Sequence, residues 1–350
     1  MTCEVRAFLS WAEWLLKTAY AGEDVVMVNM DETAVERLIP HRQGNSVVFR
    51  PMSAAAGHVY ERIARRDSHG HVTLMGCVSS VPELQPLLPQ FVLANDARLS
   101  RAEAIKLRSL RAPLLWLEGC AGWVNSDSFC QILTRLRRAI MAVRPSARVV
   151  IACDSATQHT TLQVVNHAAR LRVQLLYIPG RLTWLLQPLD THVFGAMKHR
   201  LRHVQCSARA ASTDGTLARA DWIDFLEQVV HEFLVSRLWT HCFAENGLLG
   251  ISDSLRERVR RDGGAVADII AEPPTDESLA LILGRARRGL ATRLNRAAVQ
   301  NQLRAEEPLS PGAADAMPLS SMMATAPLED VPAVPAPIAS RTRSRSALHL

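Results

Sequence analysis

Three short apolar runs, each followed by an aspartate, dominate the hydrophobic pattern of this chain. The runs read VVMVNM, RVVIAC and VQLLYI and span residues 25–30, 148–153 and 173–178. Runs of this length, rich in β-branched residues, are typical of buried strands. Asp31 and Asp154 directly follow the first two runs, and Asp190 follows the third after a loop. The pattern therefore predicts three buried strands with an acidic side chain at or just beyond the end of each.

Alternation and helical spacing predict the remaining elements. HVTLMGCVS, from His71, alternates with Val72, Leu74, Gly76 and Val78 on one side, which suits an antiparallel strand. The first strand is expected to leave the sheet soon after Asp31, with a turn beginning at Thr33. Shorter strands are expected at 46–50, at 90–94 and within PLLWLEG. Helices are expected over 1–21, 129–140, 160–171, 189–204, 220–246 and 276–304. This order of elements indicates a mixed α/β fold.

Composition narrows the class of protein. The chain has 350 residues, of which 48% are hydrophobic, enough for a large core. Seven cysteines are scattered without a C-x-x-C pair, which argues against a zinc module and a disulfide framework. No apolar run approaches 18 residues and the N-terminal apolar stretch contains acids, so neither a membrane span nor a signal peptide is expected.

The positive charge is compatible with a nucleic-acid partner. The formal net charge is +6 with 40 basic residues, and only three of these are lysines, so 40 − 3 = 37 are arginines. Arginine pairs well with phosphate through two parallel hydrogen bonds. An arginine-rich genome explains the same bias equally well, so charge alone does not identify the partner.

The three aspartates suggest a metal site. An ionised carboxylate at the end of a buried strand is costly unless it is paired or bound to a cation. Oxygen ligands favour Mg²⁺ or Mn²⁺ over zinc or copper. A two-metal site built from carboxylates is common in enzymes that cut and join phosphodiester bonds. Asp31, Asp154 and Asp190 are therefore both the candidate catalytic residues and the candidate metal ligands.

Motifs around these aspartates resemble the catalytic blocks of DDE-superfamily transposases. The segments are NMDETAV, DSATQH and YIPGRLTWLLQPLDTHVFGAMK, and the resemblance covers roughly residues 23–250. The third segment is similar to that of the pogo-like branch of the mariner superfamily, to which centromere-protein-B and jerky-like proteins belong. The residues that match this branch are Thr183, Gln187, Pro188, Leu189, Asp190, Phe194, Gly195 and Lys198.

The resemblance implies a fold and a chemistry. It implies a ribonuclease-H-like mixed sheet flanked by helices, in which the strands that carry Asp31 and Asp154 are neighbours. It also implies that these two residues share one Mg²⁺ or Mn²⁺ ion and that Asp190 helps to hold a second. The implied activity is DNA cleavage by water and strand transfer by a 3′-hydroxyl. A nuclear location follows from the DNA substrate, a homodimer is compatible with the family, and no small-molecule cofactor is expected.

Several neighbouring residues are candidates for supporting roles. Glu32 alternates to the opposite face of its strand from Asp31, so it is expected to support the site from behind. Ser155 replaces the asparagine that usually follows the second acid in the family. His159 is expected to orient Asp154, to contact a phosphate or to make an ordinary hydrogen bond. Candidate DNA-binding residues follow Asp190 on the polar faces of its helix: Lys198, Arg200 and Arg202.

The predicted organisation has four parts. Residues 1–22 are expected to form a linker helix, 23–210 the catalytic domain, and 211–304 a C-terminal helical region. Residues 305–350 are rich in proline, alanine and serine and end in the basic RTRSRS, which predicts a disordered tail. The family's DNA-recognition modules would lie upstream of the linker helix and are not expected within this sequence.

Two other functions compete with the nuclease interpretation. A haloacid-dehalogenase-like phosphatase needs an aspartate nucleophile two residues before Asp31, but Asn29 occupies that position. A domesticated or degraded transposase fragment that only binds nucleic acid is the stronger alternative. Retention of all three acids favours an active nuclease, whereas the Ser155 replacement and the missing recognition modules favour the binding protein.

Overall fold

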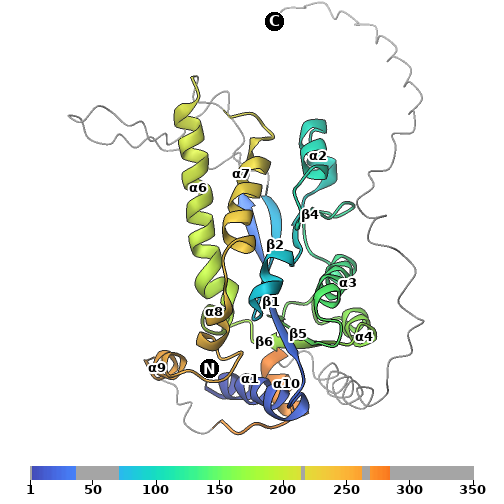
Figure 1. Ribbon diagram of the computed structural model, residues 1–350, viewed down its shortest axis with the longest axis vertical. Coiled ribbons are helices and arrows are strands. Elements are labelled where there is room, and N and C mark those ends of the chain that lie inside the picture. Colours follow the sequence, from blue (N-terminus) through green and yellow to red (C-terminus); the bar gives the residue numbers. More distant parts are fainter. Residues whose placement is uncertain (1, 37–70, 214–216, 262–268, 284–350) are drawn as a thin grey trace, which may run out of the picture. The chain divides into compact units, whose positions relative to one another are not determined.

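A six-stranded mixed sheet lies at the centre of the fold in this computed structural model, which describes residues 2–36, 71–213, 217–261 and 269–283 (Figure 1). The strands are β1 (Val25–Glu36), β2 (His71–Ser79), β3 (Gln90–Leu93), β4 (Leu114–Trp116), β5 (Arg148–Asp154) and β6 (Val173–Ile178). Their order across the sheet is β4-β3-β2-β1-β5-β6.

Strand directions follow the ribonuclease-H-like order expected from the motifs. β2 runs antiparallel to both β1 and β3, whereas β1, β5 and β6 run parallel to one another. The short strand β4 extends the sheet beyond β3 in parallel. The predicted fold class, a mixed α/β sheet flanked by helices, is confirmed. β1 and β5, whose apolar runs end in Asp31 and Asp154, are neighbours at its centre.

Helices pack on both faces of the sheet and at its end. Ten α-helices are assigned within the described residues: α1 (Thr2–Trp14), α2 (Arg101–Arg108), α3 (Ser126–Val143), α4 (Leu162–Arg170), α5 (Thr183–Leu186), α6 (Phe194–Ala211), α7 (Asp221–Val230), α8 (Thr240–Glu245), α9 (Asp253–Arg261) and α10 (Asp276–Leu283). Short π-helical segments at 15–19, 189–193 and 231–235 extend α1, precede α6 and extend α7. α3 packs beside α4, α6 beside α7, and α1 beside α10 (Figure 1). The described residues all belong to one compact unit, which contains both the sheet and the C-terminal helices.

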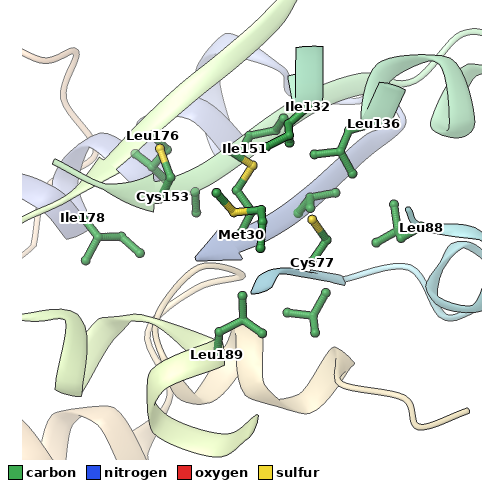
Figure 2. Close-up of a cluster of buried hydrophobic side chains, with 14 of the residues drawn as sticks. Met30, Cys77, Leu88, Ile132, Leu136, Ile151, Cys153, Leu176, Ile178 and Leu189 are labelled. Atoms are coloured by element: carbon green, nitrogen blue, oxygen red, sulfur yellow. The ribbon is translucent and has the colours of Figure 1, made fainter. Parts of the chain in front are cut away.

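Apolar side chains fill both sides of the central strands. Figure 2 shows Ile132 and Leu136 of α3 on one side of β1 and Leu189, at the start of the π-helical segment before α6, on the other. Met30 and Ile151 lie between them and are at most 1% exposed. Burial of these long apolar strands on both faces explains why their sequences read as nearly unbroken hydrophobic runs. The packing also fixes the stretches of β1 and β5 that carry the aspartates.

The predicted turn at Thr33 is wrong, because β1 continues to Glu36. Residues Asp31 to Glu36 pair with β2 in an unbroken antiparallel register, with Asp31 opposite Gly76 and Thr33 opposite Leu74. Backbone hydrogen bonds to β2 hold this polar segment in the sheet, although its sequence has no continuous apolar run. Asp31 therefore lies within a strand rather than at its end.

Some predicted elements fall outside the described residues, and three of the described helices, α2, α5 and α9, were not predicted. The expected strand at 46–50, the helix at 276–304 beyond residue 283 and the tail from 305 belong to the parts that the structure does not describe. α2 was missed because its eight residues carry only Ile105 and Leu107 as large apolar side chains. No helix among the described residues is long and apolar enough to cross a membrane.

Candidate active site

Asp31 and Asp154 lie side by side on neighbouring strands. The parallel pairing of β1 and β5 runs to Asn29 opposite Ala152, so two residues further along each strand the same register brings Asp31 beside Asp154. Asp154 is the last residue of β5 and pairs with Ile178 of β6. Asp31 and Asp154, both of which were predicted to follow buried strands, therefore lie next to each other on the same side of the sheet.

Asp190 joins them from the π-helical segment before α6. Burial raises the pKa of the Asp31 carboxyl well above its usual range, and the negative charges of Asp190 and Asp154 raise it further. A hydrogen bond from the backbone at Glu32 acts in the opposite direction. Each nearby carboxylate disfavours the charged form of Asp31. The three aspartates are thus electrostatically coupled, although they are 123 and 36 residues apart in sequence (154 − 31 and 190 − 154).

Asn29 connects the two strands to the loop that carries Asp190. Its side chain is fully buried, its amide donates to the Ala152 carbonyl of β5 at 3.0 Å, and its carbonyl accepts from the Leu189 backbone N–H at 2.9 Å. A buried amide whose hydrogen bonds are satisfied on both sides specifies one arrangement of the segments it joins. No local sequence pattern indicates this role, because Leu189, one of the two partners of Asn29, lies 160 residues away.

A histidine bridges Asp154 to Glu32. Nδ1 of His159 lies 2.6 Å from an Asp154 carboxylate oxygen, and Nε2 lies 2.9 Å from a Glu32 carboxylate oxygen. The ring is 2% exposed and stacks on Phe129 with 4.2 Å between ring centres. Burial alone would lower the pKa of His159, but hydrogen bonds to both carboxylates outweigh burial and raise this pKa to about 9. His159 is therefore a doubly protonated cation that orients Asp154.

Ser155 and the β6–α5 loop border the same acid. Ser155 is half-buried, and its hydroxyl lies 3.6 Å from the position that a Cβ on Gly180 would occupy. The hydroxyl therefore faces the start of the loop that leads towards Asp190.

Close packing of Phe194 fixes the start of α6 against the sheet. Gly76 of β2 pairs with Asp31, and a Cβ at Gly76 would lie 3.0 Å from the Phe194 ring. Phe194 follows Asp190 by four residues and so lies on the same face of the helical segment. The absence of a side chain at Gly76 allows Asp190 to approach the strand that carries Asp31.

The C-terminal helical region also holds this loop. The fully buried Asn246 accepts a hydrogen bond from Thr191 at 3.1 Å and donates to the Leu185 carbonyl at 2.7 Å. Glu245 lies 2.9 Å from His192, and this hydrogen bond lowers the pKa of Glu245. The last residue of α8 and the residue after it therefore hold the turn that presents Asp190.

The basic residues of α6 differ in their surroundings. Arg200 donates to Glu232 at 2.9 Å, so its charge is used in joining α6 to the segment after α7. Lys198 is half-buried and Arg202 is exposed. Of the three predicted DNA-binding residues, Arg202 is the most accessible to a phosphate.

The donor chemistry suits a hard divalent cation. Asp31, Asp154 and Asp190 offer only oxygen ligands. Burial is the main cause of the raised pKa of Asp31, and the charges of Asp190 and Asp154, which a cation would neutralise, raise it further. Gln187 adds a fully buried amide beside Asp31, and neither of its polar atoms has a hydrogen-bond partner. Within the described residues, however, no three His, Cys, Asp or Glu side chains are grouped closely enough to hold a metal ion. The three side chains are of the type that binds such a cation, but their carboxylates do not converge on one point.

Comparison with known protein families identifies a related endonuclease family. Residues 72–230 match the family model for the DDE superfamily endonuclease. This part of the chain is similar to the DDE superfamily of endonucleases. The matched range includes Asp154 and Asp190, and Asp31 precedes it. The predicted family is confirmed at this level, whereas the pogo-like branch is not distinguished from others.

Solved structures of a mariner transposase are similar over most of the chain. The Mos1 paired-end complex with the left transposon end is 19% identical with a TM-score of 0.36, over 70% of this chain and 62% of that one. The corresponding complex with Mn is 17% identical with a TM-score of 0.35, over the same shares. The Mos1 catalytic domain alone is 16% identical with a TM-score of 0.33, over 70% of this chain and 94% of that domain. Curated protein sequences gave no match.

Proposed function

We propose that this chain is a transposase-type nuclease that uses Mg²⁺ or Mn²⁺ to cut and join phosphodiester bonds in DNA. The observation that carries the proposal is the pairing of β1 with β5, which brings Asp31 beside Asp154, together with the hydrogen bond from Leu189 to Asn29 that holds the segment of Asp190 to β1, in a chain with a DDE endonuclease domain. Three carboxylates that repel one another in the folded state form a site whose negative charge a divalent cation relieves. Mos1 transposase has been crystallised with Mn and with Mg, which supports the choice of ions.

Each aspartate has a distinct place in this proposal. Asp31 and Asp154, adjacent on β1 and β5, would share one ion, and the exposed Asp190 would help to hold a second close to solvent. Bound ions would lower the pKa of the attacking hydroxyl and stabilise the leaving oxygen. His159 and Glu32 would hold the Asp154 carboxylate in one orientation, while Asn29 and Asn246 hold the loop of Asp190.

Plasmid nicking tests the proposal. Purified protein should convert supercoiled plasmid to open circles with Mn²⁺ or Mg²⁺ and not with chelator. Asp154→Asn should abolish nicking, whereas Asp127→Asn should retain it, because Asp127 lies on α3 and bonds only Gln163 among the described polar contacts. Equal nicking by wild type and Asp154→Asn would refute the proposal.

DNA binding by α6 is a second part of the proposal. Arg202 and Lys198 would contact phosphates next to the acids, and Arg200 would not, because Glu232 neutralises it. Arg202→Ser should weaken binding to random duplex DNA and reduce the slope of log K against log salt by about 1. Arg200→Ser is the matched control and should leave the slope unchanged. Equal slopes for Arg202→Ser and wild type would remove α6 from the DNA surface.

One observation favours a protein that binds DNA without cutting it. The described acidic side chains are not grouped at metal-ligand spacing. A transposase-derived DNA-binding protein would show salt-dependent DNA affinity that Mn²⁺ does not change, and no nicking. The two assays therefore separate the nuclease from this alternative.

A further inference from the structure

Gln187 is an unusual buried amide. Its side chain is 0% exposed, and neither its carbonyl oxygen nor its amide nitrogen has a hydrogen-bond partner. Two other fully buried glutamines are satisfied: Gln85 accepts from Ser79 N and donates to the Leu234 carbonyl, and Gln90 accepts from Cys77 N and donates to its carbonyl. Buried polar groups are almost always paired, so the side chain of Gln187 requires an explanation.

The backbone of Gln187 is fully engaged and fixes its position. Its N–H donates to the Thr183 carbonyl and its own carbonyl accepts from Thr191 N, both at 3.0 Å. It follows α5 and precedes Pro188, and Asp190 lies three residues further on. The side chain is therefore held in place by its surroundings without using either of its polar atoms.

The unpartnered amide lies against the acidic site. Leu189, two residues after Gln187, donates its backbone N–H to the Asn29 side chain at 2.9 Å, and Asn29 precedes Asp31 by two residues on β1, so the segment of Gln187 is held beside the strand of Asp31. Gln187 is accordingly one of the groups that act on the Asp31 carboxyl. The contact falls short of hydrogen-bond geometry, so the amide is beside the carboxylate without being bonded to it. An amide in this position offers one donor to a carboxylate and one acceptor to a water molecule.

We infer that Gln187 is a positioning residue for the acidic site. When the carboxylates close around a divalent cation, its side-chain N–H donates to Asp31 and its carbonyl oxygen accepts from a water molecule in the site. The amide, which has no hydrogen-bond partner among the described residues, is then satisfied on both sides. This inference rests on the proposed metal-dependent function.

Substitution by an apolar residue of similar length tests the inference. Gln187→Met removes both unpartnered polar atoms, so the metal-free unfolding temperature should stay the same or rise. Mn²⁺ affinity, measured by calorimetric titration, should fall by about 10- to 100-fold, as it does when a partner of a metal ligand is lost. The matched control is Gln205→Met on α6, because Gln205 is 4% exposed and its amide nitrogen also lacks a partner. That variant should bind Mn²⁺ like the wild type.

A second variant keeps the test informative if Gln187→Met is poorly folded. Gln187→Glu places a fourth carboxylate beside Asp31, so it should lower the unfolding temperature in chelator. The rise in unfolding temperature that Mn²⁺ produces should then be larger than in wild type. A residue that only fills space would lose the same stability with and without Mn²⁺.

The outcomes separate this inference from the proposed function. Wild-type Mn²⁺ affinity in Gln187→Met, together with a lower metal-free unfolding temperature, would overturn the inference and leave the nuclease proposal intact. Absence of Mn²⁺ binding by the wild type would overturn both. Weaker binding by Gln187→Met with normal binding by Gln205→Met supports the inference.

Discussion

The bridge from Glu32 through His159 to Asp154 predicts a stability that falls in alkaline solution. The folded state raises the pKa of His159 from 6.5 to about 9. Because the folded state binds this proton more tightly than the unfolded state, the stabilisation is complete below pH 6.5 and is lost as the pH rises through 9. The difference of 2.5 in pKa (9 − 6.5) corresponds to about 3 kcal/mol at 1.36 kcal/mol for each pKa unit.

Urea denaturation in chelator at pH 6 and pH 9.5 measures this loss. The wild type should lose about 3 kcal/mol more than His159→Gln over this range, because the variant cannot titrate at that position. The comparison cancels the other groups that titrate in both proteins. Imidazole NMR signals should also show His159 titrating near pH 9. Parallel pH profiles in the two proteins, or a His159 pKa near 6.5, would refute the bridge.

Three further substitutions test the surroundings of the site. Asp190→Ala removes a charge that repels Asp31, so the variant should be more stable than the wild type in chelator. It should lose most of the stabilisation by Mn²⁺, which is roughly 2–4 kcal/mol in the wild type at 100–1,000 times the Kd. An unchanged response to Mn²⁺ in calorimetry would contradict this prediction. Gly76→Ala should lower the free energy of unfolding, measured in urea, by about 1–3 kcal/mol, because the added methyl group presses on the Phe194 ring. An unfolding free energy equal to that of the wild type would mean that the ring moves freely. Asn246→Ala should lower the free energy of unfolding by about 1–3 kcal/mol in the same assay and should reduce plasmid nicking. Normal nicking would show that the loop of Asp190 does not depend on the hydrogen bonds of Asn246.

Much of the fold was predictable because its central strands are buried on both faces. The runs that became β1, β5 and β6 are apolar almost throughout, so their identity did not depend on distant partners. The end of β1 was predicted wrongly because the polar segment from Asp31 to Glu36 is held by its pairing with β2, which local sequence does not reveal. α2 escaped prediction because it has little apolar surface, although Ser100 and Glu103 form a capping box that marks its start.

The acids of the site were predicted more readily than the residues that hold them. Asp31 and Asp154 follow recognisable runs, and Asp190 lies in a specific motif. By contrast, the sequence around Asn29 predicts only a strand. Its amide connects β1 to the loop of Asp190 through a hydrogen bond from Leu189, and this contact forms only in the folded chain. Gln187 belongs to the motif, but its sequence position does not show that its amide is buried without partners. Long-range hydrogen bonds of this kind leave no periodic signal in a single sequence.

The most direct test is to locate a divalent cation in the folded protein. Crystals grown with Mn²⁺ would show its position through anomalous scattering, and the same crystals with chelator give the matched control. The nuclease account predicts a Mn²⁺ peak between the neighbouring carboxylates of Asp31 and Asp154, with Asp190 drawn towards it. A folded protein in which Mn²⁺ is absent from these carboxylates, or is bound only elsewhere, would contradict it.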